Sequence, residues 1–335
     1  MVATRYTVDH RFLTDHDHLI LKVLRLYYEH DLNQVEVARR MGFSRPKVSK
    51  LITEGRNRGL VKIEIAEPAG DAASLEIALE DRYGLVEALV VASSEDRQST
   101  ELAAGAVGGA LLARLCTAKS TLGVSWGVSV RALADAVPAM SFRCGKVVPL
   151  VGGMGKAEKG LHSNQVCANL AGKLDADYLQ LSAPAIARSE RSRDELMEMP
   201  GISETLTEAA SCDVAVAGIG GILPTSTMVE AGYFTREEFL GLRNLGAVGD
   251  ICCHFLDSEG RPCLEGLSSR ILGLTLEQLR EIPRTVGIVT GAGKAPGVAA
   301  VLKGGYVNTL VCDRDLAESL LQNRRDNERE EGPRR

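Results

Sequence analysis

The chain has 335 residues, 45% of them hydrophobic and 25% charged, the balance of a globular protein with room for one large and one small domain. Its net charge of −5 argues against a protein that coats nucleic acid along its whole surface. Because it lacks an apolar run of roughly 18 residues, a signal peptide, and CxxC or zinc spacing among its eight cysteines, we expect a reduced cytoplasmic protein without membrane partner, metal or cofactor.

Three helices are expected at the start of the chain. Apolar residues at helical spacing predict the first from Asp15 to Glu29. Asn33 is a good N-cap for the second, with a glutamate three residues on as in a capping box, and Gly42 ends it. Ser44 is the expected N-cap of the third, with Pro46 in its first turn, where a missing N–H costs nothing.

The spacing within these helices predicts a helix-turn-helix. Ala38, Gly42, Val48 and Leu51 supply a small residue at the helix crossing, a turn glycine and two inward apolar residues. From Arg39 to Lys62 there are eight basic residues against one acid, which is where an anionic polymer would bind. A helical hairpin with a solvated basic face is the alternative. The residues assigned to the DNA interface are Arg39, Ser44, Arg45, Pro46, Lys47, Ser49 and Lys50.

Domain boundaries follow from changes in composition. An alternating stretch, Arg58 to Ile65, predicts a strand that suits a short wing. We expect a DNA-binding domain at residues 1–65, a linker at 66–73 and an effector-binding and oligomerisation domain at 74–322. Residues 323–335 are charged and poor in apolar side chains, which predicts a disordered tail.

The body of the chain alternates short apolar runs with amphipathic stretches, which predicts an α/β, Rossmann-like doubly wound domain with a mostly parallel sheet. Helices are expected between most strands, for example from Ser99 to Cys116 and from Lys294 to Lys303. The expected strands are Ala88–Val91, Thr121–Ser125, Lys146–Val151, Tyr178–Leu181, Val214–Gly220, Ala247–Cys252, Thr285–Thr290 and Tyr306–Cys312.

Ligands of such sheets bind beyond the carboxyl ends of the strands, so the glycine-rich loops there are candidate sites. Gly127, Val128 and Ser129 open one helix and could cradle a phosphate, and Lys294 opens another, where its ammonium could meet an anion. Tight packing also explains such glycine loops, and none matches the full dinucleotide or Walker pattern.

Four other side chains carry open alternatives. His162 suits a surface position or a ligand contact, and Asn164 suits a helix cap or a ligand contact. Asp250 follows a strand that reads as buried, a costly place for a carboxylate, which indicates a hydroxyl-binding or capping role. Trp126 is expected in the core or at a subunit contact.

The ordered series SRPKVSKLI, GVSWGVSV, VVPLVGGMG, AVGDICCHFLDSEG and GIVTGAGKAPGVAAVLKGGYVNTLVCD resembles the SorC family of bacterial sugar-operon regulators over about Asp15 to Leu321. The resemblance implies double-stranded operator DNA as a partner, and a large domain like that of sugar-phosphate isomerases of the glucosamine-6-phosphate deaminase type. It also implies a homo-oligomer, often a tetramer, and a sugar, polyol or sugar-phosphate effector. By this resemblance the effector-binding positions fall on Gly127, Val128, Ser129, Gly152, Gly153, His162, Asp250 and Lys294.

One position departs from that pattern. Val151 stands where some members with phosphosugar effectors carry a basic residue, which puts a bisphosphate effector in doubt. The alternative function is a sugar-phosphate isomerase or deaminase with a DNA-binding appendage, in which Asp250 and His162 would form the acid–base pair. A nonspecific nucleoid protein conflicts with the acidic body of the chain.

Overall fold

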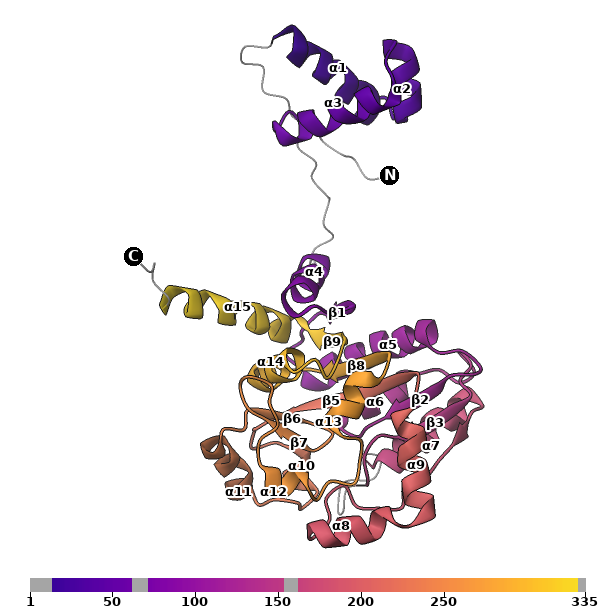
Figure 1. Cartoon of the computed structure of the whole chain (residues 1–335), viewed down its shortest axis with the longest axis vertical. Helices are drawn as coiled ribbons and strands as arrows, with labels where there is room; N and C mark the ends of the chain where they lie inside the picture. The colour runs from indigo at the N-terminus through magenta and orange to yellow at the C-terminus, as the bar shows by residue number, and fades with distance from the viewer. Residues whose placement is uncertain (1–13, 62–71, 154–161, 331–335) are drawn as a thin grey trace. The chain divides into compact units, whose positions relative to one another are not determined.

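The computed structural model describes residues 14–61, 72–153 and 162–330, with side chains described as far as residue 322. The chain divides after Gly70 into two compact units, which are described separately (Figure 1). Within the described residues no helix is long and apolar enough to cross a membrane.

The first unit consists of α1 (Asp15–Tyr28), α2 (Gln34–Met41) and α3 (Arg45–Asn57). The predicted capping box of α2 is confirmed: Asn33 Oδ1 accepts from the N–H of Glu36 at 3.1 Å, and the Asn33 N–H donates to Glu36 Oε2 at 2.8 Å. Gly42 ends α2 with a φ of 69°, a conformation that favours glycine. Ser44 precedes α3, but its side chain makes no capping hydrogen bond.

The core of this unit confirms the helix-turn-helix spacing. Ala38, Val48 and Leu51 are buried between the three helices, and α3 contacts both α1 and α2. The predicted wing falls mostly on residues 62–65, which lie outside the described residues. The buried core comprises Ile20, Val23, Leu24, Leu26, Val37, Ala38, Val48, Leu51 and Ile52.

The larger unit is built on a parallel sheet in the order β1-β9-β8-β5-β2-β3-β4, which confirms the doubly wound α/β fold. Figure 1 shows the strands at the centre of this unit with helices around them. The parallel strands are β1 (Glu87–Val91), β2 (Thr121–Val124), β3 (Lys146–Pro149), β4 (Asp177–Tyr178), β5 (Val214–Gly221), β8 (Arg284–Val289) and β9 (Thr309–Asp313).

Helices cover both faces of this sheet. Successive residues of a strand point to opposite faces, so Val214 and Val216 join one buried cluster while Ala215 and Ala217 join the other. The helices of the first cluster are α5 (Arg97–Leu115), α6 (Val128–Ala136) and α7 (Ser163–Leu174). Those with residues in the second include α4 (Ala72–Tyr83), α9 (Pro200–Ala210), α13 (Leu276–Glu281), α14 (Ala295–Lys303) and α15 (Arg314–Glu330).

Short helices complete the larger unit: α8 (Glu190–Met197), α10 (Thr227–Glu230), α11 (Arg236–Gly241), α12 (Glu265–Ser268) and the 3-10 turns η1 (Leu242–Leu245) and η2 (Ala292–Lys294). The strand order reverses beside β2. After β2 the chain moves outward through β3 and β4, and it returns to β5 on the other side of β2. The crevice beyond the carboxyl ends of β2 and β5 is therefore the expected ligand position.

Three expectations differ from the structure. The strand expected at Ala247–Cys252 is β6 (Gly249–Ile251), which pairs antiparallel with β5 and with β7 (His254–Leu256), a strand that was not predicted. The turn between β6 and β7 places Cys252 and Cys253 at φ 49° and 69°. Such hairpin turns normally carry Asn or Gly, so a pair of cysteines gives no sequence signal for a turn at this position.

The other two differences concern the ends of elements. β4 stops at Tyr178, and the backbone of Leu181 instead exchanges two hydrogen bonds with the side-chain amide of Asn164. The other concerns residues 323–335, for which disorder was predicted: α15 continues as helix to Glu330, and residues 331–335 lie outside the described residues. No glycine or proline interrupts the sequence between Arg314 and Gly332, and Arg and Glu are good helix formers.

Candidate functional site

The N-terminal part of α3 presents the predicted DNA face. The side chains of Arg45, Pro46, Lys47 and Lys50 are exposed, while Ser49 is half-buried. Ser44 before the helix and Arg39 on α2 are also exposed. The Lys47 ammonium lies 4.0 Å above the ring of Phe43, which holds that side chain at the start of α3. An exposed cationic helix face of this kind is suited to the major groove.

Not every basic residue of this unit is available for DNA. Arg58 forms an ion pair with Asp17 on α1 and a second with Glu54 on α3, so it ties the two helices together. Hydrogen bonds from Thr14, and then the Arg58 guanidinium, lower the pKa of Asp17 to about 2. Arg58 is therefore a structural residue in the free protein.

A cleft of about 930 Å³ lies at the switch point of the larger unit. The segments that follow β1, β2, β5, β8 and β9 line it, so it sits beyond the carboxyl ends of the central strands. Its volume is at the upper end of the range for small-molecule sites. Among the predicted effector residues, it brings together Gly127, Val128, Ser129, Asp250 and Lys294.

The N-terminus of α6 forms one wall of the cleft. Gly127 precedes this helix with a φ of 131°, which favours glycine, and its carbonyl accepts the hydrogen bond from the Arg131 N–H at 2.9 Å. This turn leaves the first N–H groups of α6 at the cleft beside Ser129, a buried hydroxyl. Backbone N–H groups at such a position favour an oxygen ligand.

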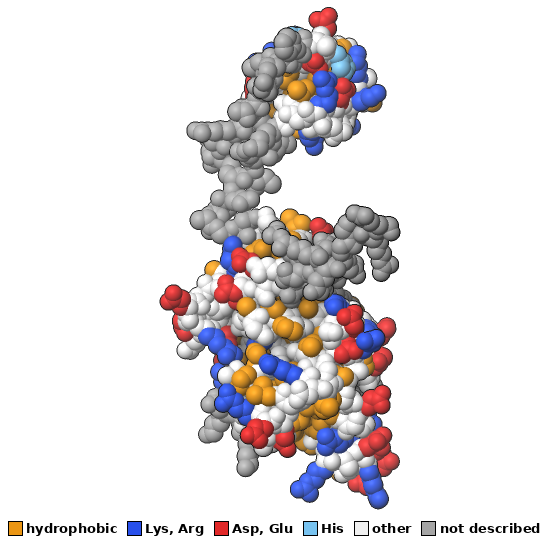
Figure 2. Space-filling view, turned by 90° about the vertical axis from the view of Figure 1, so that its left-hand side faces the viewer, with side chains coloured by type: hydrophobic (Ala, Val, Ile, Leu, Met, Phe, Trp, Pro, Cys, Tyr) orange, Lys and Arg blue, Asp and Glu red, His pale blue; other side chains and the backbone are white. Residues whose placement is uncertain are grey.

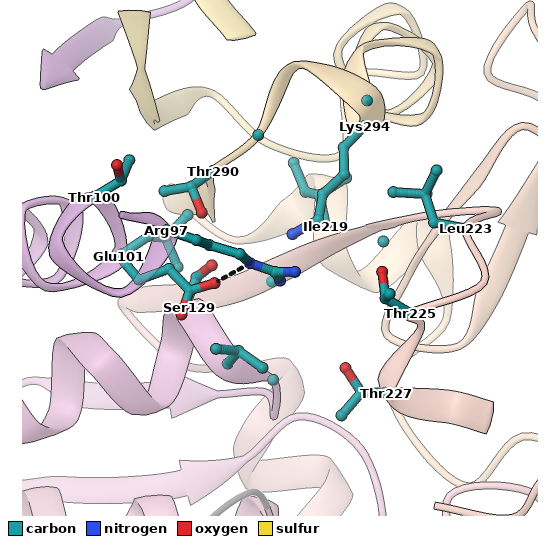
Figure 3. A pocket seen from close by; sticks show the side chains of 18 of the residues that line it. Arg97, Thr100, Glu101, Ser129, Ile219, Leu223, Thr225, Thr227, Thr290 and Lys294 are labelled. Carbon is teal, nitrogen blue, oxygen red and sulfur yellow. Dashed lines mark hydrogen bonds and ion pairs between the residues drawn. The ribbon is translucent and has the colours of Figure 1, made fainter. Parts of the chain in front are cut away.

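Lys294 and Arg97 bring positive charge into the cleft from η2 and α5. In Figure 3 the side chains of Lys294 and Arg97 point into the same part of the cleft, Lys294 from the segment that precedes α14. Arg97 Nε donates to Glu101 Oε1 at 2.8 Å. Burial lowers the pKa of Lys294, and the nearby Arg97 charge lowers it further. No ion pair joins Lys294 to an acid within the described residues.

Asp250 occupies a different place from the one predicted. It lies within β6, opposite Gly220 of β5, and does not follow a parallel strand. A Cβ at Gly220 would collide with Asp250 Oδ1, so the glycine makes room for the carboxylate. Burial raises the pKa of Asp250 to about 7, although a hydrogen bond from the Cys253 N–H and the Lys294 charge oppose the shift.

Two polar groups at the cleft lack hydrogen-bond partners among the described residues. They are the hydroxyl of Thr290, whose side chain is only 3% exposed, and the buried Nε1 of Trp126. Trp126 packs against the buried core, as sequence analysis expected as one alternative, and it also lines the cleft. Buried polar groups are normally paired, so both groups are suited to a ligand.

The remaining predicted effector residues are not among those that line the cleft. The Gly152 N–H donates to Leu272 O at 2.8 Å, and the Gly153 N–H donates to Ala183 O at 2.9 Å. His162 is the N-cap residue of α7 and faces Gly153. The side-chain amide of Asn164 forms two hydrogen bonds with the backbone of Leu181. The intervening residues 154–161 lie outside the described residues.

Sequence analysis missed Arg97, Glu101, Thr290 and Asp313 as cleft residues. Thr290 and Asp313 come at the carboxyl ends of β8 and β9, so the strand-end rule could have found them. Arg97 and Glu101 stand on a helix whose approach to the cleft depends on tertiary packing, and no sequence signal marks them.

Comparison with known proteins places this architecture in a family. The family model described as "Putative sugar-binding domain" matches residues 67–322, and the one described as "Sigma-70, region 4" matches residues 21–58. The "Sorbitol operon regulator" of Klebsiella pneumoniae is 33% identical over 312 residues, covering 92% of this chain and 99% of that protein. The chain belongs to the SorC family of transcriptional regulators.

Further similarities agree with this membership. The crystal structure of the full-length sorbitol operon regulator from K. pneumoniae matches with a TM-score of 0.71, covering 92% of this chain and all of that one. The "Deoxyribonucleoside regulator" of Bacillus subtilis is 27% identical, covering 90% of this chain and 97% of that protein. This SorC family member is thus a transcriptional regulator that joins a helix-turn-helix unit to a sugar-binding domain.

Proposed function

We propose that this chain represses or activates a carbohydrate or polyol catabolic operon in response to a small molecule bound in the cleft of its larger unit. The single observation that carries the proposal is the location of that cleft. It lies at the switch point of a sugar-binding domain whose chain also carries an exposed basic α3. Effector binding and DNA binding are then coupled, and linkage requires that each changes the affinity for the other.

The proposed contacts follow from exposure and burial. Operator DNA is contacted by Arg39, Ser44, Arg45, Pro46, Lys47, Ser49 and Lys50, within a DNA-binding domain at residues 1–65. The effector contacts Gly127, Val128, Ser129, Asp250 and Lys294, within a domain at residues 74–322 that follows the linker. The other proposed effector contacts are Gly152, Gly153, His162 and Asn164.

We further propose a cytoplasmic homo-oligomer, with a tetramer as the expected state. Paired helix-turn-helix units on a two-fold axis match the half-sites of a palindromic operator. The effector would act by changing how the subunits pack and therefore how these units are spaced.

Catalysis is not part of the proposed function. An isomerase or deaminase needs a positioned acid and base at one site. Asp250 lines the cleft, but His162, its suggested partner, is not among the described residues that line it. The face of the larger unit in Figure 2 mixes acidic, basic and apolar side chains, which does not favour a nonspecific nucleoid protein.

The test is a binding assay with purified full-length protein and labelled DNA from upstream of its own operon. Titrations with salt and with unrelated DNA measure specificity, and a thermal-shift screen of sugars, polyols and sugar phosphates is repeated with the DNA present. We expect operator preference and at least one compound that changes DNA affinity without being consumed. Turnover of a sugar phosphate would favour the enzyme, and equal affinity for all DNA would refute operator control.

A further inference from the structure

The charges that line the cleft are mostly negative. Among the described residues of its lining, seven are acidic and three are basic, namely Arg97, Arg131 and Lys294. A phosphate monoester carries close to two negative charges at neutral pH and would have to enter this acidic surface. An acidic lining of this kind disfavours a dianionic ligand.

Carboxylates lie near two of these cations, Arg97 and Lys294. The Arg97 guanidinium is held by Glu101 at 2.8 Å, and the side chain of Glu101 is only 11% exposed. Burial and the Arg97 charge lower the pKa of Lys294, and the charges of Glu101, Asp313 and Asp250 only partly oppose that shift. A phosphate at this position would compete with carboxylates that the protein itself supplies.

Besides Lys294, two neutral groups of residues that line the cleft lack partners among the described residues. Thr290 and Trp126 line the cleft, and the Thr290 hydroxyl and the Trp126 indole N–H are buried without a hydrogen bond among the described residues. In Figure 3, Thr225 and Thr227 extend hydroxyls from the side opposite Glu101 and Ser129. Hydroxyls, carboxylates and an indole N–H together can donate to and accept from the hydroxyl groups of a ligand.

We propose that the effector is an uncharged polyhydroxyl compound, a polyol or an unphosphorylated sugar, and that the Thr290 hydroxyl, the Trp126 indole and the Glu101 carboxylate bind its hydroxyl groups. This inference rests on the proposed function and narrows its effector class. The open N-terminus of α6 then receives a hydroxyl oxygen of the same ligand.

The first experiment compares matched compounds on the full-length protein by thermal shift in phosphate-free buffer. One set holds erythritol, ribitol, sorbitol and fructose, and the other holds their monophosphate esters. We expect an uncharged compound to raise Tm and its ester to bind at least tenfold more weakly, with the uncharged compound's affinity unchanged by ionic strength.

Two variants on one strand segment separate ligand binding from folding. Thr290→Val removes a hydroxyl that has no hydrogen-bond partner among the described residues, so the Tm of the free protein should stay unchanged or rise. The affinity for the uncharged ligand should fall by about three- to tenfold. Thr285→Val, at the other end of β8, removes a hydroxyl that donates to Leu279 O at 3.2 Å. This control should lower Tm and leave ligand affinity unchanged.

A third variant tests the charge argument. Glu101→Gln should weaken the uncharged ligand and improve binding of its ester, whereas Glu204→Gln, which removes an equal charge from the exposed surface of α9, should change neither. An ester that binds more tightly than its parent compound overturns the proposal while the regulator function stands. No Tm shift with either set, and DNA affinity unaffected by both, overturns the proposal together with effector control.

Discussion

The buried carboxylate of Asp250 makes the stability of the larger unit depend on pH in a predictable direction. Burial raises its pKa from 3.8 to about 7. A carboxyl whose pKa is higher in the folded state binds its proton more tightly there than in the unfolded chain. Its contribution to stability is complete below about pH 4 and is lost as the pH rises through about 7.

The size of this effect follows from the shift in pKa. A difference of about three pKa units corresponds to about 4 kcal/mol of unfolding free energy, since one unit is worth about 1.4 kcal/mol. Asp250→Asn has nearly the same shape and keeps an oxygen that can accept from the Cys253 N–H, but it does not titrate. Relative to this variant, the wild type should lose about 3 kcal/mol between about pH 5 and pH 8.

The measurement is urea unfolding of both proteins across this pH range, without effector, followed by tryptophan fluorescence. Trp126 is the single tryptophan and lies at the same cleft, so its signal reports on the larger unit. A gap between the two unfolding free energies that stays constant from pH 5 to pH 8 would refute the reasoning. It would mean that Asp250 is solvated or paired well enough to ionise normally.

Three further outcomes are expected. The double variant Lys47→Ala, Lys50→Ala should abolish operator binding or, where some affinity remains, reduce the slope of log affinity against log salt concentration by about 2. Its unfolding free energy should fall by no more than the roughly 0.5–1 kcal/mol of the contact between Lys47 and the Phe43 ring. A folded double variant with full affinity contradicts the groove assignment. Lys294→Ala should weaken effector-induced stabilisation and move the titration of the larger unit to higher pH, because this ammonium opposes the raised pKa of Asp250; an unchanged melting shift removes Lys294 from the site. The pKa of Asp17 is lowered to about 2, so its stabilisation of the first unit is present above about pH 4 and lost toward pH 2. The protection of α1 amides, measured as hydrogen exchange relative to the intrinsic rate at each pH, should therefore fall toward pH 2 in the wild type but not in Asp17→Asn.

The helix-turn-helix was predictable because its determinants are local. Asn33, Gly42 and Pro46 act through backbone bonds within a few residues of themselves, and the inward positions Val48 and Leu51 follow from the helical period. The same locality predicted the parallel strands, since a strand buried on both faces is a continuous apolar run. The strand-end rule then selected the loop at Gly127–Ser129.

The β6–β7 hairpin was not predictable in this way. The run around Asp250 is apolar enough for a parallel strand, and its antiparallel pairing depends on the extension of β5 at Gly220. Only that pairing explains why a carboxylate is tolerated there and why its pKa rises. Chain direction is a property of the partner strand, and the sequence of β6 alone does not contain it.

By itself, the sequence determined the two-part architecture, the basic face of α3 and the wall of the cleft at the N-terminus of α6, because each depends on neighbouring residues. The tertiary structure alone decided which side chains meet in the cleft. It joined Arg97 and Glu101 from α5 to Thr290 and Lys294, and it left Gly152 and Asn164 bonded elsewhere. The physical reason is that hydrogen bonds within an element follow the chain, whereas the charge and burial of a site depend on helices and strands brought together by packing.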